Sequence, residues 1–305
     1  MLAEGPFLAC DWGTTNLRAW LIGVDGNVVE ARDFPLGVSR LQPGEAARRF
    51  REEVRPALDA EGLPALLCGM IGSNLGWVSA PYLDCPADIG DLGAALVDPE
   101  PGDPPVRIVP GLRGPGITAA PDVMRGEETQ VFGWIAQDEA RGRGRHVICH
   151  PGTHAKWVLV EDGRIVRFVT AMTGELFATL SRHGVLATAS TPGDESAFRQ
   201  GVEAAGDGDA LSARLFSVRS RVVGGDADPD TSASYLSGLL IGSEIAALPH
   251  LLGVPSNAPV ALLGEETLLR WYGLALDLRG RRHSLHSGDE AALAGLKALY
   301  AGADR

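Results

Sequence analysis

The segment CDWGTTNLRAW, residues 10–20, is the most informative part of the sequence about the fold. An apolar run over residues 7–11 ends in Asp11, and a second apolar run begins at Leu17. A surface turn requires a glycine or an asparagine, but this connection carries more small polar residues than a turn needs. Backbone amides and hydroxyls at the end of a strand favour an anion, and the Asp11 carboxylate favours a cation beside it. The small polar residues of the connection are Gly13, Thr14, Thr15 and Asn16.

The same pattern of strand, Gly-Thr loop, strand, tight turn and strand occurs a second time, in VICHPGTHAKWVLVEDGRIVRFVT, residues 147–170. Gly152 and Thr153 of this repeat match Gly13 and Thr14. His150 stands where the first copy has its aspartate, so only the first copy keeps the carboxylate. Two hairpins of this kind indicate a duplicated domain. The strands predicted for the first copy are residues 7–11, 17–24 and 28–34.

Three further segments are predicted elements. ALLCGMIGSNLGW, residues 65–77, is a strand that runs into a polar, glycine-rich loop containing Ser73 and Asn74. VALLGEETLLRWY, residues 260–272, is a strand, a turn at Gly264 and the start of a helix, which is a usual place for a phosphate or a ribose. SGDEAALAGLKALY, residues 287–300, is a closing helix.

Composition restricts the class of protein. A chain of 305 residues favours two domains. The formal net charge of −12 argues against nonspecific binding to nucleic acid, but it does not exclude ATP. The four cysteines form no Cys-x-x-Cys pair, which favours reduced thiols and a cytoplasmic location. YLSGLLIGSEIAAL, residues 235–248, is interrupted by Glu244 and is shorter than a membrane span, so we expect a buried helix and no membrane contact.

Glu127 and Glu128, in VMRGEETQVFGW, are the candidate general bases for transfer of a phosphoryl group to a hydroxyl. Acidic residues in the first turn of a helix also stabilise the helix, so the pattern alone leaves both interpretations open. Arg18 and Arg125 are candidates for binding a phosphate or a substrate carboxylate, although a loop arginine is more often part of a surface ion pair. A zinc site formed by the three histidines at 146, 150 and 154 is not expected, because Pro151 and Gly152 break the helix that would align them.

Taken together, these motifs resemble the 2-dehydro-3-deoxygalactonokinase family, which is part of the superfamily of sugar kinases, actin and Hsp70. The resemblance implies an α/β fold of two RNase H-like domains, expected at residues 1–120 and 121–305, with the active site in the cleft between them and the last helix packing back across the junction. It also implies an ATP-dependent phosphorylation of the 6-hydroxyl of 2-dehydro-3-deoxy-D-galactonate in galactonate degradation. The motifs that carry it are DWGTTNLRAW, GMIGSNLGW, PYL, IVPGL, VMRGEETQ, PGTHAKWV, MTGEL and SGLLIGSE.

The resemblance also implies roles for individual residues. Asp11 would position Mg²⁺, and an acid of the Gly-Glu-Glu segment would take the hydroxyl proton, with Glu127 preferred to Glu128. Arg125 would hold the substrate carboxylate, with Arg18 as a second candidate. LLGEE around Gly264 departs from the superfamily's double glycine, which leaves the adenine contacts open. The remaining implied contacts are Gly13, Thr14, Thr15, Gly152 and Thr153 for the phosphates, Gly264 for adenosine, and Ser73 and Asn74 for the sugar acid.

Three alternatives are left open at this stage. The acceptor could be another sugar acid, such as the gluconate epimer, because one stereocentre is worth only a few kcal/mol of discrimination. The protein could instead be an exopolyphosphatase-like phosphohydrolase, since such proteins also pair a glycine-rich loop with a Gly-Glu-Glu segment. A non-catalytic regulator is least favoured, because the chain lacks a basic patch and a helix-turn-helix extension. The sequence does not determine the oligomeric state, and a homodimer is left open.

Overall fold

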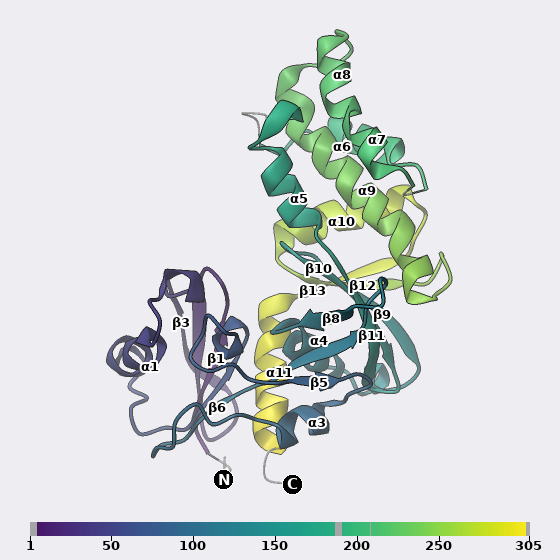
Figure 1. Cartoon of the computed structure of the whole chain (residues 1–305). Helices are drawn as coiled ribbons and strands as arrows, with labels where there is room; N and C mark the ends of the chain where they lie inside the picture. Colours follow the sequence, from purple (N-terminus) through teal and green to yellow (C-terminus); the bar gives the residue numbers. More distant parts are fainter. Residues whose placement is uncertain (1–4, 187–190, 208, 303–305) are drawn as a thin grey trace. The chain divides into compact units, whose positions relative to one another are not determined.

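The computed structural model describes residues 5–186, 191–207 and 209–302, and the chain divides into two compact units (Figure 1). Unit 1 comprises Met1–Arg145, Val160–Arg167 and Gly288–Arg305, and unit 2 comprises His146–Leu159 and Phe168–Ser287. This division rests on contacts within the chain. The pair of domains expected at residues 1–120 and 121–305 stays a prediction.

The first sheet of unit 1 has the strand order β3-β2-β1-β4-β6. β1 and β2 pair antiparallel, as do β2 and β3, whereas β4 runs parallel to both β1 and β6. β1 and β4 are buried almost throughout, as expected for central strands covered on both faces. The strands are β1 (Phe7–Trp12), β2 (Leu17–Ile22), β3 (Val28–Phe34), β4 (Ala65–Cys68) and β6 (Val106–Ile108).

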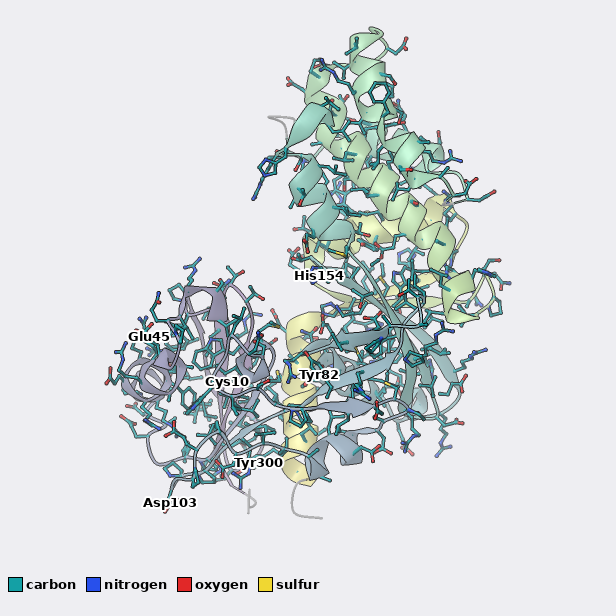
Figure 2. The ribbon with its side chains drawn as sticks, viewed as in Figure 1. Cys10, Glu45, Tyr82, Asp103, His154 and Tyr300 are labelled. Atoms are coloured by element: carbon teal, nitrogen blue, oxygen red, sulfur yellow. The ribbon has the colours of Figure 1, made fainter. Side chains whose placement is uncertain are left out.

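Residues of α1 and η2 share one hydrophobic core with β1, β2 and β4. The closing helix α11 packs against β1, β4 and α4 (Figure 1). The crossing of α4 and α11 depends on Gly133 and Gly295, because a Cβ at either position would collide with the backbone of the other helix. The rings of Phe7 and Tyr300 stack with centroids 3.7 Å apart, which shows how closely α11 lies on β1 (Tyr300 is labelled in Figure 2). The helices are η1 (Val38–Arg40), α1 (Glu45–Arg49), η2 (Phe50–Val54), α2 (Arg55–Ala57), η3 (Met70–Gly72), α3 (Ile89–Ala94), α4 (Glu127–Ala136), η4 (Glu139–Gly142) and α11 (Gly288–Gly302).

Unit 1 also contains a small three-stranded sheet of order β5-β7-β8. β5 runs parallel to β7, and β7 pairs antiparallel with β8. β8 leads directly into α4, so this sheet fixes the point at which the Gly-Glu-Glu segment begins. The strands are β5 (Tyr82–Asp84), β7 (Gly111–Pro115) and β8 (Pro121–Met124).

The second five-stranded sheet has the order β11-β10-β9-β12-β13. β12 runs parallel to both β9 and β13. Numbered along the chain, its strands lie in the order third, second, first, fourth and fifth, which is also the order in the first sheet. The hairpin repeat predicted from the sequence therefore corresponds to two sheets with the same strand order. The strands are β9 (Arg145–His150), β10 (Ala155–Glu161), β11 (Arg164–Ala171), β12 (Val260–Gly264) and β13 (His283–Ser287).

A helical layer completes unit 2, with α9 packed against α5 to α8 and α10 (Figure 1). Gly201, Gly238 and Gly242 allow α6 and α9 to approach closely, because a Cβ at any of them would meet the backbone of the opposite helix. The helices are α5 (Thr173–Leu180), η5 (Gly184–Leu186), α6 (Glu195–Ala204), α7 (Leu211–Leu215), α8 (Ser217–Val223), η6 (Pro229–Thr231), α9 (Ser232–Leu252) and α10 (Glu266–Leu278).

One helical segment within the described residues, Pro229–Leu252, is long and apolar enough to pass a membrane-span test based on length and composition. In its most apolar window 72% of the segment is buried inside the structure. The prediction of a buried helix is therefore confirmed. The cysteines at 10, 68 and 149 are buried and unpaired, and Cys85 is half-buried and unpaired. The cytoplasmic location stays a prediction.

Candidate active site

The β1–β2 loop is held in place through its carbonyl groups. The carbonyl oxygens of Gly13, Thr14 and Thr15 accept hydrogen bonds from backbone N–H groups of residues 37–39. Gly37 has to be a glycine, because a Cβ there would collide with the backbone of this loop. Within the described part of the chain, the N–H groups of Thr14 and Thr15 donate to no backbone carbonyl outside regular elements. Thr14 and Thr15 are exposed, so their amides and hydroxyls are accessible to a ligand.

A cavity of about 540 Å³ lies beside this loop in unit 1, and Asp11 is one of its walls. The pKa of Asp11 is raised to about 6, mainly by burial and then by the neighbouring carboxylate of Asp289, with a smaller contribution from Glu127. Arg18 acts in the opposite direction. A carboxylate crowded by other carboxylates is a favourable place for a cation. The residues lining the cavity are Asp11, Gly13, Thr15, Asn16, Arg18, Asp33, Phe34 and Pro35.

Two glycines with positive φ bring the Gly-Glu-Glu segment next to Asp11. A Cβ on Gly69 (φ 89°) would lie 2.8 Å from the Trp12 carbonyl oxygen and 3.0 Å from Asp11 Oδ1. A Cβ on Gly126 (φ 106°) would lie 3.1 Å from the Gly69 Cα. The ends of β1 and β4 and the start of α4 are therefore in backbone contact, which only glycine allows at these two positions.

Glu127 and Glu128 are the first two residues of α4, but their environments differ. Glu127 is half-buried, and its Oε2 accepts the Arg125 N–H at 3.0 Å. Glu128 is fully buried, and its carboxylate accepts the Gly126 N–H at 2.7 Å and the Thr129 hydroxyl at 3.0 Å. The pKa of Glu128 is raised to about 8, mainly by burial and to a smaller extent by the Glu127 carboxylate. Of the two, Glu127 is the one that a substrate can reach.

The two candidate arginines are both engaged by the protein. The Arg18 guanidinium forms ion pairs with Asp33, at 2.6 Å, and with Asp289 at the start of α11. Arg125 is buried, donates from Nη2 to the Ala80 carbonyl at 2.7 Å and lies over the Tyr82 ring. Its Nε and Nη1 have no hydrogen-bond partner among the described residues.

The predicted sugar loop follows η3 and lies beside Arg125. A Cβ on Gly72 would be 2.9 Å from Arg125 Nη1. Ser73 is buried, and its hydroxyl oxygen accepts the Leu75 N–H at 3.2 Å, whereas Asn74 is exposed. Asn74 is therefore accessible to a ligand, and the Ser73 hydroxyl helps to shape the turn.

In unit 2, the second Gly-Thr loop joins β9 to β10 and packs on the start of α5. Glu175 donates its N–H to the Thr153 carbonyl at 3.0 Å, and the Glu175 carboxylate pairs with His154 at 2.5 Å (His154 is labelled in Figure 2). A Cβ on Gly174 would lie 2.7 Å from the Thr153 Cα, so a side chain there would displace the loop. Gly264, at the end of β12, approaches the same loop at Pro151.

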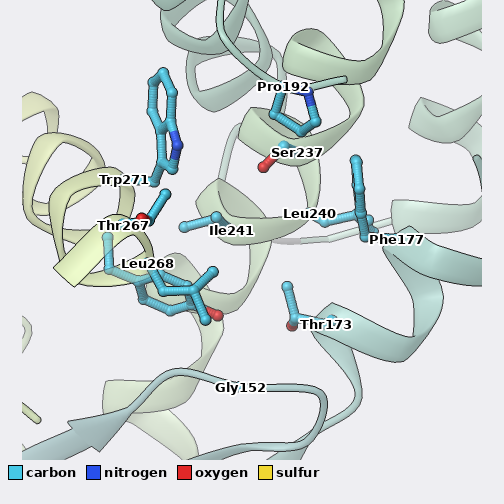
Figure 3. Close-up of a pocket in the computed structure, with 12 residues that line it drawn as sticks. Gly152, Thr173, Phe177, Pro192, Ser237, Leu240, Ile241, Thr267, Leu268 and Trp271 are labelled. Carbon is cyan, nitrogen blue, oxygen red and sulfur yellow. The ribbon is translucent and has the colours of Figure 1, made fainter. Parts of the chain in front are cut away.

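A cavity of about 230 Å³ lies next to this loop within unit 2 (Figure 3). Gly152 forms one side, and α10, which starts after Gly264, supplies apolar and aromatic side chains on another. Small-molecule sites are mostly apolar with a few polar groups, and this lining has that character. The lining residues are Gly152, Thr173, Gly174, Phe177, Pro192, Ser237, Leu240, Ile241, Thr267, Leu268, Trp271 and Tyr272.

The two cavities also involve residues that were not predicted from the sequence as site residues. Asp289 lies close enough to Asp11 to raise its pKa, and Asp33 lines the same cavity. The sequence signal for Asp289 was only its place in the first turn of a helix, which has an ordinary structural explanation. Thr173 and Gly174, in the MTGEL motif, line the cavity of unit 2.

Comparison with known proteins shows the family to which the chain belongs. The family model described as 2-keto-3-deoxy-galactonokinase matches residues 11–299. The chain belongs to the 2-keto-3-deoxy-galactonokinase family. A relative from Rhizobium meliloti (strain 1021), provisionally named 2-dehydro-3-deoxygalactonokinase, is 38% identical over 98% of this chain and 97% of its own. The 2-dehydro-3-deoxygalactonokinase of Escherichia coli (strain K12) is 35% identical over 96% of this chain and 97% of its own.

A solved structure supports the family assignment at the level of the fold. It is a crystal structure from Sinorhizobium meliloti of a protein provisionally named 2-dehydro-3-deoxygalactonokinase, and the two chains are 35% identical. The match covers 96% of this chain and 97% of the other, with a TM-score of 0.85. This member of the 2-keto-3-deoxy-galactonokinase family is therefore a mixed α/β protein and a phosphotransferase, as the sequence motifs predicted.

Proposed function

We propose that this protein transfers the γ-phosphoryl group of ATP to the 6-hydroxyl of 2-dehydro-3-deoxy-D-galactonate. Membership of the family supports the reaction and the acceptor. The observation that carries the proposal within this chain is the glycine-dependent contact that brings Asp11 and the start of α4 together. A carboxylate that binds a cation and a carboxylate that can accept a hydroxyl proton then lie in one place.

ATP would be bound by the two Gly-Thr loops and by the cavity of unit 2. The amides and hydroxyls of Gly13, Thr14 and Thr15 would contact the β- and γ-phosphates, and Gly152 and Thr153 would contact them from the second loop. The nucleoside would occupy the cavity of unit 2, which the Gly152 loop and α10 line. The equal strand orders of the two five-stranded sheets support two RNase H-like domains. We infer that the reaction takes place in the cleft between these domains.

The residues at Asp11 suit a magnesium ion. Burial and two neighbouring carboxylates oppose the ionised form of Asp11, and a divalent cation would remove this opposition. No group of three or more metal-ligating side chains is found among the described residues, so Asp11 would share the ion with phosphate oxygens and water. When bound, Mg²⁺ neutralises charge on the phosphates during transfer.

Glu127 is the proposed general base, and Glu128 supports it. The Glu127 carboxylate is accessible and would accept the proton of the attacking hydroxyl. The bond from the Arg125 N–H fixes one of its oxygens. Glu128 is buried and is bonded to Gly126 and Thr129, so it fixes the backbone turn on which Glu127 sits.

The acceptor would be oriented by residues around the η3 loop. Arg125 has two guanidinium nitrogens without hydrogen-bond partners among the described residues, which suits a substrate carboxylate once the loop beside Gly72 adjusts. Asn74 is exposed for hydroxyl contacts, and Ser73 shapes the same turn. Arg18 is the weaker candidate, because its charge is already offset by two aspartates.

The test is ADP release from Mg²⁺-ATP across a panel of acceptors: 2-dehydro-3-deoxy-D-galactonate, its gluconate epimer, galactonate, galactose, glycerol and no acceptor. Selective turnover with the galactonate derivative is expected. Selective turnover with the epimer would mean that the protein is a kinase of the same type whose acceptor is the gluconate derivative. If ADP is released as fast without any acceptor as with one, the proposed kinase activity would be contradicted and a phosphohydrolase activity supported.

A further inference from the structure

A buried carboxylate lies beneath the cavity of unit 2. Glu244, in the largely apolar α9, is only 5% exposed. Its Oε1 accepts the indole N–H of Trp157 at 2.6 Å, and its Oε2 accepts the hydroxyl of Tyr272 at 2.9 Å. The Thr173 hydroxyl also hydrogen-bonds this carboxylate. One side chain therefore joins four elements, β10, α5, α9 and α10.

A carboxylate at this position is costly if its purpose is only packing. Burial raises the pKa of Glu244, and the three hydrogen bonds from Thr173, Trp157 and Tyr272 partly oppose this effect. An apolar side chain in the same helix would avoid the desolvation cost altogether. The carboxylate therefore fits a role in fixing its three partners better than a role in the core.

Two of the three partners line the cavity. Thr173, labelled in Figure 3, and Tyr272 are both part of its lining. A hydroxyl has one proton. The Tyr272 proton is directed to Glu244, and the Thr173 proton is shared between Glu244 and the Tyr272 oxygen, so both protons stay within this group. Towards any other group, the two oxygens can therefore act only as hydrogen-bond acceptors. Their side of the cavity favours a ligand that carries N–H or O–H donors.

We propose that Glu244 is a positioning residue for the nucleotide: it holds Thr173 and Tyr272 so that the cavity wall accepts hydrogen bonds from donor groups of the nucleoside. The donors of an adenine nucleoside are its amino group and its ribose hydroxyls. This inference rests on the proposed function, in which the nucleoside occupies this cavity. Glu244 itself touches neither the substrate nor the reacting atoms.

The test is Glu244→Gln, which keeps the volume and changes the hydrogen-bonding pattern. The Trp157 indole can only donate, so it retains the amide oxygen, and the amide NH₂ then faces Tyr272 and reverses that hydrogen bond. We expect the KM for ATP to rise about tenfold or more, because the reversed bond releases the Tyr272 proton and removes an acceptor from the cavity wall. The KM for the sugar acid should stay within twofold. An unchanged KM for ATP, or an equal rise in both KM values, would overturn the proposal.

Tyr272→Phe keeps the test decisive if Glu244→Gln does not fold. It removes the hydroxyl that Glu244 positions, so the KM for ATP should rise while that for the sugar acid does not, and an unchanged KM for ATP overturns the proposal. In the double variant the KM for ATP should rise no more than in the more affected single variant, because both changes act through one contact. Effects that multiply would show that Glu244 does not act through Tyr272.

A separate variant tests the placement of the nucleoside. Ser237 lies on α9 and lines the cavity (Figure 3), so Ser237→Phe would fill it. A higher KM for ATP in Ser237→Phe with a normal KM in Glu244→Gln would overturn only the role of Glu244. A normal KM for ATP in Ser237→Phe would instead overturn the placement of the nucleoside.

Discussion

Replacing Glu128 by glutamine should change how the stability of the protein depends on pH. Glu128 is fully buried at the start of α4, and burial raises its pKa from the ordinary 4.5 to about 8. Between these two pH values the folded protein holds a proton that the unfolded chain has lost. The free energy of unfolding therefore falls as the pH rises, by about 1.4 kcal/mol per pH unit, and the whole effect is about 5 kcal/mol.

The Glu128→Gln variant imitates the protonated acid and has no proton to lose. Its oxygen can accept the Gly126 N–H, and its NH₂ can donate to the Thr129 hydroxyl oxygen. We expect the free energy of unfolding of the variant, relative to wild type, to rise by about 4 kcal/mol between pH 5 and pH 8. Asp11 titrates in both proteins, so its contribution cancels in the difference.

The assay is urea unfolding followed by tryptophan fluorescence at pH 5, 6, 7 and 8. Glu139→Gln is the control, because the Glu139 side chain is 93% exposed and its ion pair with Arg143 should contribute little at any pH. Parallel pH profiles for wild type and Glu128→Gln would refute the reasoning, since they would mean that Glu128 is ionised in the folded protein over this range.

Three further variants test the site. Glu127→Gln should lower kcat by about 10²–10⁴ with little change in either KM, because it removes the general base, and near-normal turnover would shift that role to Glu128. Gly174→Ala should raise the KM for ATP about tenfold by displacing the Gly152 loop, as measured by steady-state kinetics, and an unchanged KM would contradict the close packing. Arg125→Ala should raise the KM for the sugar acid at least tenfold while the KM for ATP stays normal, and an unchanged KM for the acid would remove Arg125 from the acceptor site.

The hairpins and their loops could be predicted from the sequence because local signals determine them. Apolar runs bounded by Gly-Thr loops and tight turns placed β1 to β3 close to their observed bounds. They also predicted that β9 to β11 repeat the same pattern. The buried state of α9 was likewise predicted from its length and its single glutamate. These features depend on residues that are neighbours in the chain.

The contacts that build the site join residues far apart in the chain, so no local pattern of residues predicts them. Gly69 and Gly126 appear in the sequence as ordinary loop glycines, but the structure makes them the point at which β1, β4 and α4 meet. The position of Asp289 near Asp11 could not be predicted for the same reason, because it depends on how α11 packs on β1. The difference between Glu127 and Glu128 could not be predicted either, since only packing decides which of two adjacent acids is buried.

The most direct test of the central claim is the ³¹P NMR spectrum of the products formed from Mg²⁺-ATP and 2-dehydro-3-deoxy-D-galactonate. Transfer to the 6-hydroxyl predicts ADP together with one new phosphomonoester whose phosphorus is coupled to the two protons of a CH₂ group. A spectrum that contains only ADP and inorganic phosphate, with the sugar acid unchanged, would contradict the account.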